Sequence, residues 1–131
     1  MSEAELWQAQ SRRDLAAAQA LLPAGLHGHA AFHLQQAAEK ALKALVIAKQ
    51  NRLPRTHDLV ILAQQAQVTL HPAEMDQLEE LNVLYTSTRY PGDWGLLPDG
   101  QPSPAQLAHY ASLAEKLLQV PLWRYEKAGI G

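Results

Sequence analysis

Apolar residues recur along most of the chain at the three- and four-residue spacing that places them on one face of an α-helix. The longest series falls within a helix predicted near 27–51 and advances in steps of four, three, four and three residues, through Leu34, Ala38, Ala41, Leu45 and Ala48. Such a series predicts one continuous apolar face. β-Branched residues are few and scattered, so no segment predicts a strand.

Two capping boxes mark the starts of the first and last predicted helices. Ser2 is followed three residues later by Glu5, and Ser103 by Pro104 and Gln106. In a capping box the side chains at the first and fourth positions bond to backbone N–H groups that the helix leaves unpaired. The first helix should run to about residue 22, where a proline and a glycine follow, and the last should weaken around residue 121.

Two further helices are predicted between these. Thr56 is a plausible N-cap of the third helix, with Asp58 in its first turn. The fourth opens with Pro72 at its first position and ends at Tyr90–Gly92. Together the signals predict one all-α domain over 1–131, an antiparallel up-and-down bundle of four to five helices. Its core should span about 2–120, and 121–131 should form a loose tail.

Composition narrows the class of protein. Hydrophobic residues make up 47% of the 131, which argues against a disordered chain. A formal net charge of −2 predicts no bulk attraction to nucleic acid or to an anionic membrane. The chain has no cysteine, which excludes disulfides and thiolate chemistry. The acidic N-terminus is not a secretory signal and no apolar run could span a bilayer, so we expect a cytoplasmic protein.

The clearest candidate chemistry is a polar stripe on the second predicted helix. Gln36, Glu39, Lys40 and Lys43 occupy positions i, i+3, i+4 and i+7. Glu39 and Lys43 can pair in the favourable order. The stripe is either a solvated face with an exposed ion pair or a surface turned toward a partner helix or a ligand.

Other candidates lie at predicted helix ends. His57 and Asp58 are placed where backbone N–H groups could bind a phosphate, although capping by Asp58 alone explains its position. Arg89 is in the last predicted turn of the fourth helix, where it either interacts with the helix dipole or binds a phosphate or carboxylate.

His29 and His33 are four residues apart, but a metal needs three or four convergent ligands, so we expect no metal site and no cofactor.

Four segments in this order resemble the HEPN domain: Asp14–Leu15, Phe32–Leu45, Thr56–Leu59 and Ser87–Pro91. The similarity runs from about residue 5 to residue 120. The resemblance implies an antiparallel helical bundle that forms a homodimer and often acts beside a minimal nucleotidyltransferase in toxin–antitoxin or nucleotide-handling systems. It also implies a ligand site at Lys40, Lys43, His57, Asp58, Arg89 and Tyr90.

Some HEPN proteins are metal-independent ribonucleases, in which a histidine follows the arginine after four to six residues. Here the residue five places after Arg89 is Trp94, and no histidine occurs between Arg89 and His109. An indole cannot transfer the proton that an imidazole would. The chain therefore looks like the Arg-Tyr-Pro branch, and we expect a non-catalytic module that binds a nucleotide or phosphate. A ribonuclease with a degenerate motif and a purely structural dimerisation module remain the alternatives.

Overall fold

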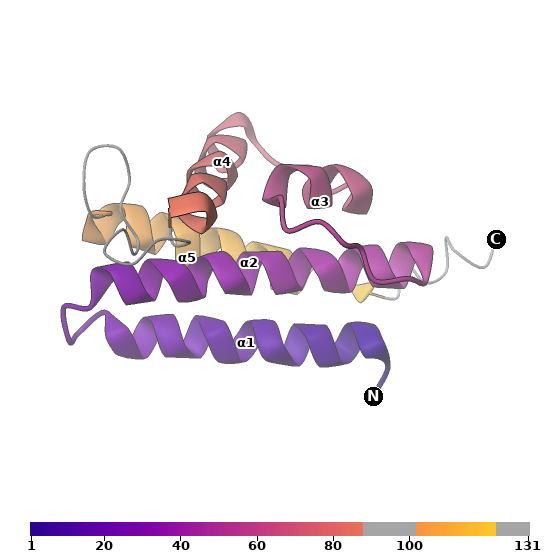
Figure 1. The fold of residues 1–131 in the computed structure, drawn as a ribbon, viewed down its shortest axis with the longest axis horizontal. Helices are drawn as coiled ribbons and strands as arrows, with labels where there is room; N and C mark the ends of the chain where they lie inside the picture. The colour runs from indigo at the N-terminus through magenta and orange to yellow at the C-terminus, as the bar shows by residue number, and fades with distance from the viewer. Residues whose placement is uncertain (88–101, 123–131) are drawn as a thin grey trace.

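Over the residues that the structure describes, five α-helices form a bundle in which one helix is central (Figure 1). The structure, a computed structural model, describes residues 1–87 and 102–122. Its helices are α1 (Glu3–Leu21), α2 (His27–Gln50), α3 (Leu59–Ala66), α4 (Pro72–Ser87) and α5 (Pro104–Gln119). α1 and α2 run antiparallel, and α2 contacts all four other helices. The predicted all-α bundle is confirmed.

The central position of α2 follows from apolar residues on more than one of its faces. The predicted series is buried at Leu34, Ala38, Ala41 and Leu45, while Ala48 is half-buried. The structure adds a second series outside that prediction, at Ala30, Ala31, Ala37, Leu42, Ala44 and Val46, each with no exposed surface. A helix that is apolar nearly all round is expected to lie inside a bundle.

The other helices supply the rest of the core largely as their periodicity predicts. At the three- and four-residue spacing of a helix face, these helices bury Leu15, Ala18, Leu59, Leu62, Ala66, Leu78, Leu81, Leu84, Leu107, Tyr110, Ala114 and Leu117. Tyr110 is the one aromatic side chain among the largest buried ones in the described residues, and its hydroxyl donates to Glu80 Oε2 at 2.5 Å. Burial, reinforced by this bond, raises the pKa of Tyr110.

Both predicted capping boxes are confirmed, at Ser2 with Glu5 and at Ser103 with Gln106. Thr56 as the predicted N-cap of α3 was wrong, whereas the capping role considered for Asp58 is confirmed. Asp58, not Thr56, caps that helix, because its carboxylate accepts hydrogen bonds from the backbone N–H groups of Val60 and Ile61.

Thr56 instead shapes the turn before α3. Its Oγ1 accepts from the backbone N–H of Asp58 at 3.1 Å. This local bond between a hydroxyl and the backbone two residues on is the alternative to capping that threonine commonly adopts. The predicted end of the fourth helix at Tyr90–Gly92 lies outside the described residues.

None of the helices in the described part of the chain is long and apolar enough to cross a membrane.

Replacing Asp58 by alanine removes the two capping bonds of α3. The free energy of unfolding should fall by about 1 kcal/mol, whereas Asp58→Ser, which keeps a capping oxygen, should cost less. Urea unfolding of both variants measures the difference. Equal losses in the two variants would show that the cap is not the reason for the aspartate.

Glu74 joins the start of α4 to α5. Its carboxylate accepts from Lys116 Nζ at 2.6 Å and from the backbone N–H of His71 at 2.8 Å. The hydrogen bond from Lys116 is the main reason why the pKa of Glu74 lies below its usual 4.5, and the bond from the His71 N–H lowers it further. Because folding lowers this pKa, the ionised carboxyl contributes its full stabilisation at pH values above the unfolded-state pKa. That stabilisation is lost as the pH falls through the folded-state pKa.

Glu74→Gln should therefore lower the melting temperature at pH 7, and this difference should shrink as the pH falls through the lowered pKa of the wild-type carboxyl. The loss at pH 7 should be under about 1 kcal/mol, because such a partly exposed pair is screened by water. Thermal unfolding of both proteins between pH 3 and pH 7 measures it. A difference that does not change with pH would contradict this assignment.

Candidate functional site: a buried polar cluster on α2

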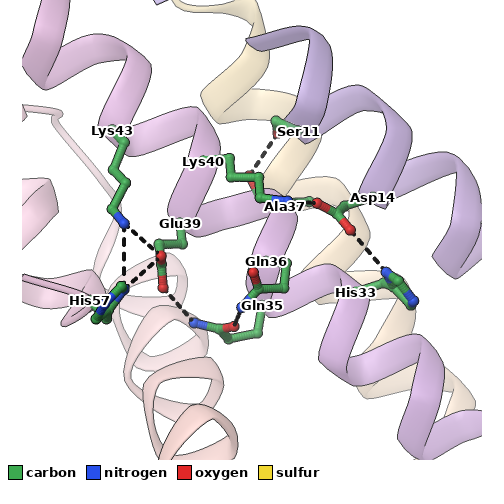
Figure 2. Close-up of polar contacts among 10 residues, drawn as sticks. All are labelled: Ser11, Asp14, His33, Gln35, Gln36, Ala37, Glu39, Lys40, Lys43 and His57. Carbon is green, nitrogen blue, oxygen red and sulfur yellow. Dashed lines mark hydrogen bonds and ion pairs between the residues drawn. The ribbon is translucent and has the colours of Figure 1, made fainter. Parts of the chain in front are cut away.

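The polar stripe of α2 lies largely inside the bundle (Figure 2). Glu39 is 4% exposed and Lys43 is 5% exposed, while Gln36 and Lys40 are half-buried. The interpretation of this stripe as a solvated face was therefore wrong for Glu39 and Lys43. The alternative, a stripe turned toward neighbouring elements, describes them correctly.

Glu39 is the centre of the first group of contacts. Its Oε2 accepts from Lys43 Nζ at 2.8 Å and lies 3.0 Å from His57 Nδ1, and its Oε1 accepts from Gln35 Nε2 at 3.3 Å. Gln36 Nε2 in turn donates to Gln35 Oε1 at 2.7 Å. Both carboxylate oxygens thus have donors, as a buried charge requires. The predicted pairing of Glu39 with Lys43 is confirmed.

The contacts also assign the tautomer of His57. An ionised carboxylate only accepts hydrogen bonds, so the contact with Glu39 places a hydrogen on Nδ1. Lys43 Nζ lies 3.4 Å from the same nitrogen, but an ammonium has no acceptor to offer it. The imidazole is 52% exposed. Glu39 therefore orients a histidine that is buried on one side and open to solvent on the other.

Trp7 of α1 also contacts Lys43. The ammonium lies 5.3 Å from the centre of the Trp7 ring, a distance at which the electron-rich face of an indole attracts a cation. Carboxylate, imidazole and indole, from three different elements, thus surround a single ammonium.

Asp14 of α1 is the centre of a second group. Its two oxygens contact Lys40 Nζ at 2.6 Å and His33 Nδ1 at 2.9 Å (Figure 2). Nearby, buried Ser11 donates from Oγ to the backbone carbonyl of Ala37 at 2.7 Å. These contacts attach α1 to α2 along a face that is otherwise mostly alanine.

The predicted site residues therefore divide among three places. Lys43 and His57 meet at Glu39, whereas Lys40 is held by Asp14. The carboxylate of Asp58 accepts hydrogen bonds from the N–H groups at the start of α3, and a phosphate bound there would need the same groups. Arg89 and Tyr90 lie outside the described residues, so their place in the site stays a prediction.

The prediction missed Trp7, Asp14 and Gln35. The available signal was the carboxylate of Asp14, which follows Arg12 and Arg13 and stands directly before the run Leu15-Ala16-Ala17-Ala18. A carboxylate beside an apolar stripe needs a cation, and Lys40 is the one that the fold brings to it. Nothing in the residue order identifies Trp7 as the cover of Lys43.

Histidines do not gather into a metal centre here. Among the described residues, no three histidine, aspartate or glutamate side chains come together in a way that could hold a metal ion. His33, one member of the pair considered from the sequence, contacts Asp14 instead.

Removing one charge of the Glu39–Lys43 pair should be worse than removing both. Glu39→Gln leaves a buried ammonium without its anion and should cost about 3 kcal/mol of unfolding free energy. The double variant Glu39→Gln/Lys43→Met should be more stable than Glu39→Gln alone, because neither buried charge remains. Denaturant unfolding of the single and double variants measures the coupling. Additive losses would mean that the two charges do not depend on each other.

Fold and site together define the class of this domain. It is an all-α bundle that buries a glutamate–lysine pair beside a half-exposed histidine. The HEPN domain family model matches residues 4–122, and the chain belongs to the HEPN family. The crystal structure of TT1696 from Thermus thermophilus is similar, with 29% identity, a TM-score of 0.69, and coverage of 90% of this chain and 94% of that one. ST0689, an archaeal HEPN homologue, is similar over all of both chains, with 25% identity and a TM-score of 0.62. None of the curated proteins matches the chain significantly.

Proposed function

We propose that this HEPN protein is a non-catalytic module that binds a nucleotide or another phosphate-bearing ligand. In this proposal it is a cytoplasmic homodimer of the Arg-Tyr-Pro branch and partners a minimal nucleotidyltransferase in a toxin–antitoxin-like system. The family includes nucleotide-binding members as well as ribonuclease toxins. The observation that carries the proposal is the half-exposed imidazole of His57, held by Glu39 next to Lys43.

The exposed imidazole of this cluster is the group that a ligand with a negative charge would contact. Glu39 neutralises Lys43, so with a neutral imidazole the cluster carries no net charge. Protonation of His57 would add one positive charge at the solvent-facing edge, where a phosphate oxygen can accept a hydrogen bond. Arg89, if it lies close as the family resemblance implies, would supply a planar guanidinium for the same phosphate.

A ribonuclease is the second candidate function, and one contact favours it. A carboxylate that holds Nδ1 of a histidine orients the imidazole for proton transfer, as Glu39 does for His57. In that case His57 would replace the histidine that is absent after Arg89. The third candidate is a module in which the cluster only fixes the packing of α1 and α2.

The binding module predicts that ATP raises the melting temperature and binds measurably in calorimetry. His57→Gln and Arg89→Ala should each weaken ATP binding by about tenfold, since each removes one charge-assisted contact. Arg13→Ala, which removes an exposed arginine of α1, is the control and should bind ATP as the wild type does.

Four results would count against this proposal. Unchanged binding in His57→Gln would place any ATP elsewhere, and no response to ATP at all would favour the packing module. Cleavage of RNA by the purified protein, lost in both variants and kept in Arg13→Ala, would favour the ribonuclease. Sedimentation that shows only monomer at micromolar concentration would contradict the homodimer.

A further inference from the structure

The backbone at the start of α3 has a hydrogen-bond partner for each of the four N–H groups that a helix leaves unpaired there. The N–H of Asp58 donates to Thr56 Oγ1 at 3.1 Å. Those of Val60 and Ile61 donate to the carboxylate of Asp58. These three bonds stay within one short segment of chain. The fourth group, the N–H of Leu59, is bound from a different helix.

Asn82 of α4 supplies that fourth partner. Its side-chain Oδ1 accepts from the N–H of Leu59 at 3.0 Å, across 23 residues of the chain. Leu59 has no exposed surface, and neither has Leu81, the neighbour of Asn82. A buried N–H group needs an acceptor from the protein because water does not reach it, and the amide oxygen of Asn82 is that acceptor. The bond therefore joins the first turn of α3 to α4.

His57 lies two residues before this bond, in the segment that connects α2 to α3. Its imidazole reaches α2, where Nδ1 lies 3.0 Å from Glu39 Oε2 (Figure 2). A hydrogen bond of this kind is lost beyond about 3.5 Å, so a shift of the segment by about 0.5 Å would break it. The contact between His57 and Glu39 therefore requires that the backbone from His57 to Leu59 stays in one place.

Neither Glu39 nor the packing of α3 is sufficient to fix that backbone. Glu39 Oε2 also accepts from Lys43 Nζ at 2.8 Å, and the imidazole is 52% exposed, so water can compete for its Nδ1. α3 has only eight residues, and a helix this short depends on tertiary contacts. Its buried leucines attach it to the core, but apolar contacts have no direction. The Asn82 bond is directional, and it binds the turn that follows His57.

We propose that Asn82 is a positioning residue for His57. By accepting from the Leu59 N–H it fixes the first turn of α3, and through that turn the distance between the His57 ring and Glu39. The ring is thereby kept in the tautomer with its hydrogen on Nδ1 and presented at the edge of the cluster. The consequence for a ligand rests on the proposed function, whereas the placement of the ring does not.

Asn82→Ala tests this role, with the tautomer of His57 as the measured quantity. At about pH 8, where an imidazole is normally neutral, the ¹⁵N shifts of the wild-type ring should show one tautomer, with the hydrogen on Nδ1. In Asn82→Ala the shifts should be those of a mixture of the two tautomers. Asn82→Leu keeps the volume of the side chain but removes the acceptor, and it should give the same mixture.

Two further variants separate positioning from a general loss of stability. Asn82→Asp keeps an oxygen acceptor at the same place, where its charge is favourable at a helix N-terminus, and it should restore the single tautomer. Glu74→Gln weakens another contact of the same helix, the one with Lys116. It should leave the ¹⁵N shifts of His57 as they are in the wild type.

ATP binding gives the measurement that depends on the proposed function. The affinity for ATP in Asn82→Ala should fall by about tenfold, the loss expected for His57→Gln itself. If ATP binds to none of these proteins, the proposed function fails, and the tautomer of His57 still decides the role of Asn82.

Three results would overturn the positioning role. An unchanged tautomer in Asn82→Ala and Asn82→Leu, together with a lower melting temperature, would make Asn82 a cap of α3 and nothing more. A mixture of tautomers that persists in Asn82→Asp, or that appears equally in Glu74→Gln, would separate the tautomer from the Leu59 bond. Loss of the fold in both Asn82→Ala and Asn82→Leu would assign Asn82 to the packing of α3 on α4.

Discussion

The ion pair between Glu39 and Lys43 is the constraint around which the bundle is arranged. Two charges on adjacent turns of α2 are almost fully removed from water, and the loss of hydration is large unless each finds partners. The fold supplies them from three directions, with Trp7 from α1, Gln35 from α2 itself and His57 from the loop before α3. The pair can be buried only where these elements meet.

That requirement explains why α2, which buries more residues than any other helix of the described chain, also has its buried charges paired within the bundle. It contacts every other helix, so the charges in its middle, Glu39 and Lys43, have little access to solvent. Asp14 forms the ion pair that compensates the charge of Lys40, as Glu39 does for Lys43. The small alanines between these charges let α1 approach closely enough for the contacts to form. Packing and electrostatics here depend on the same inter-helix distance.

The chain also separates cations held for structure from cations presented to solvent. Lys40 and Lys43 are bound by carboxylates within the bundle, whereas Arg52 and Arg55 follow the end of α2 and are exposed. His57, two residues beyond Arg55, is the link between these groups, since it contacts the buried pair and still faces water. A ligand that reaches this loop therefore meets groups connected to the bundle core. HEPN membership is in keeping with such a site but does not by itself define the ligand.

The sequence by itself determined the all-α class, the capping boxes and most of the core, because these depend on local spacing and on caps within one turn. It also indicated that Glu39 and Lys43 would pair, since both lie on one helix. Only the tertiary structure decided that this pair is buried, that Asp14 holds Lys40, and that Trp7 covers Lys43. For α3 the sequence offered both Thr56 and Asp58 as caps, since both residues are competent N-caps, and the structure shows Asp58 in that role. Burial and pairing between helices depend on which faces meet, and the order of residues along one helix does not contain that information.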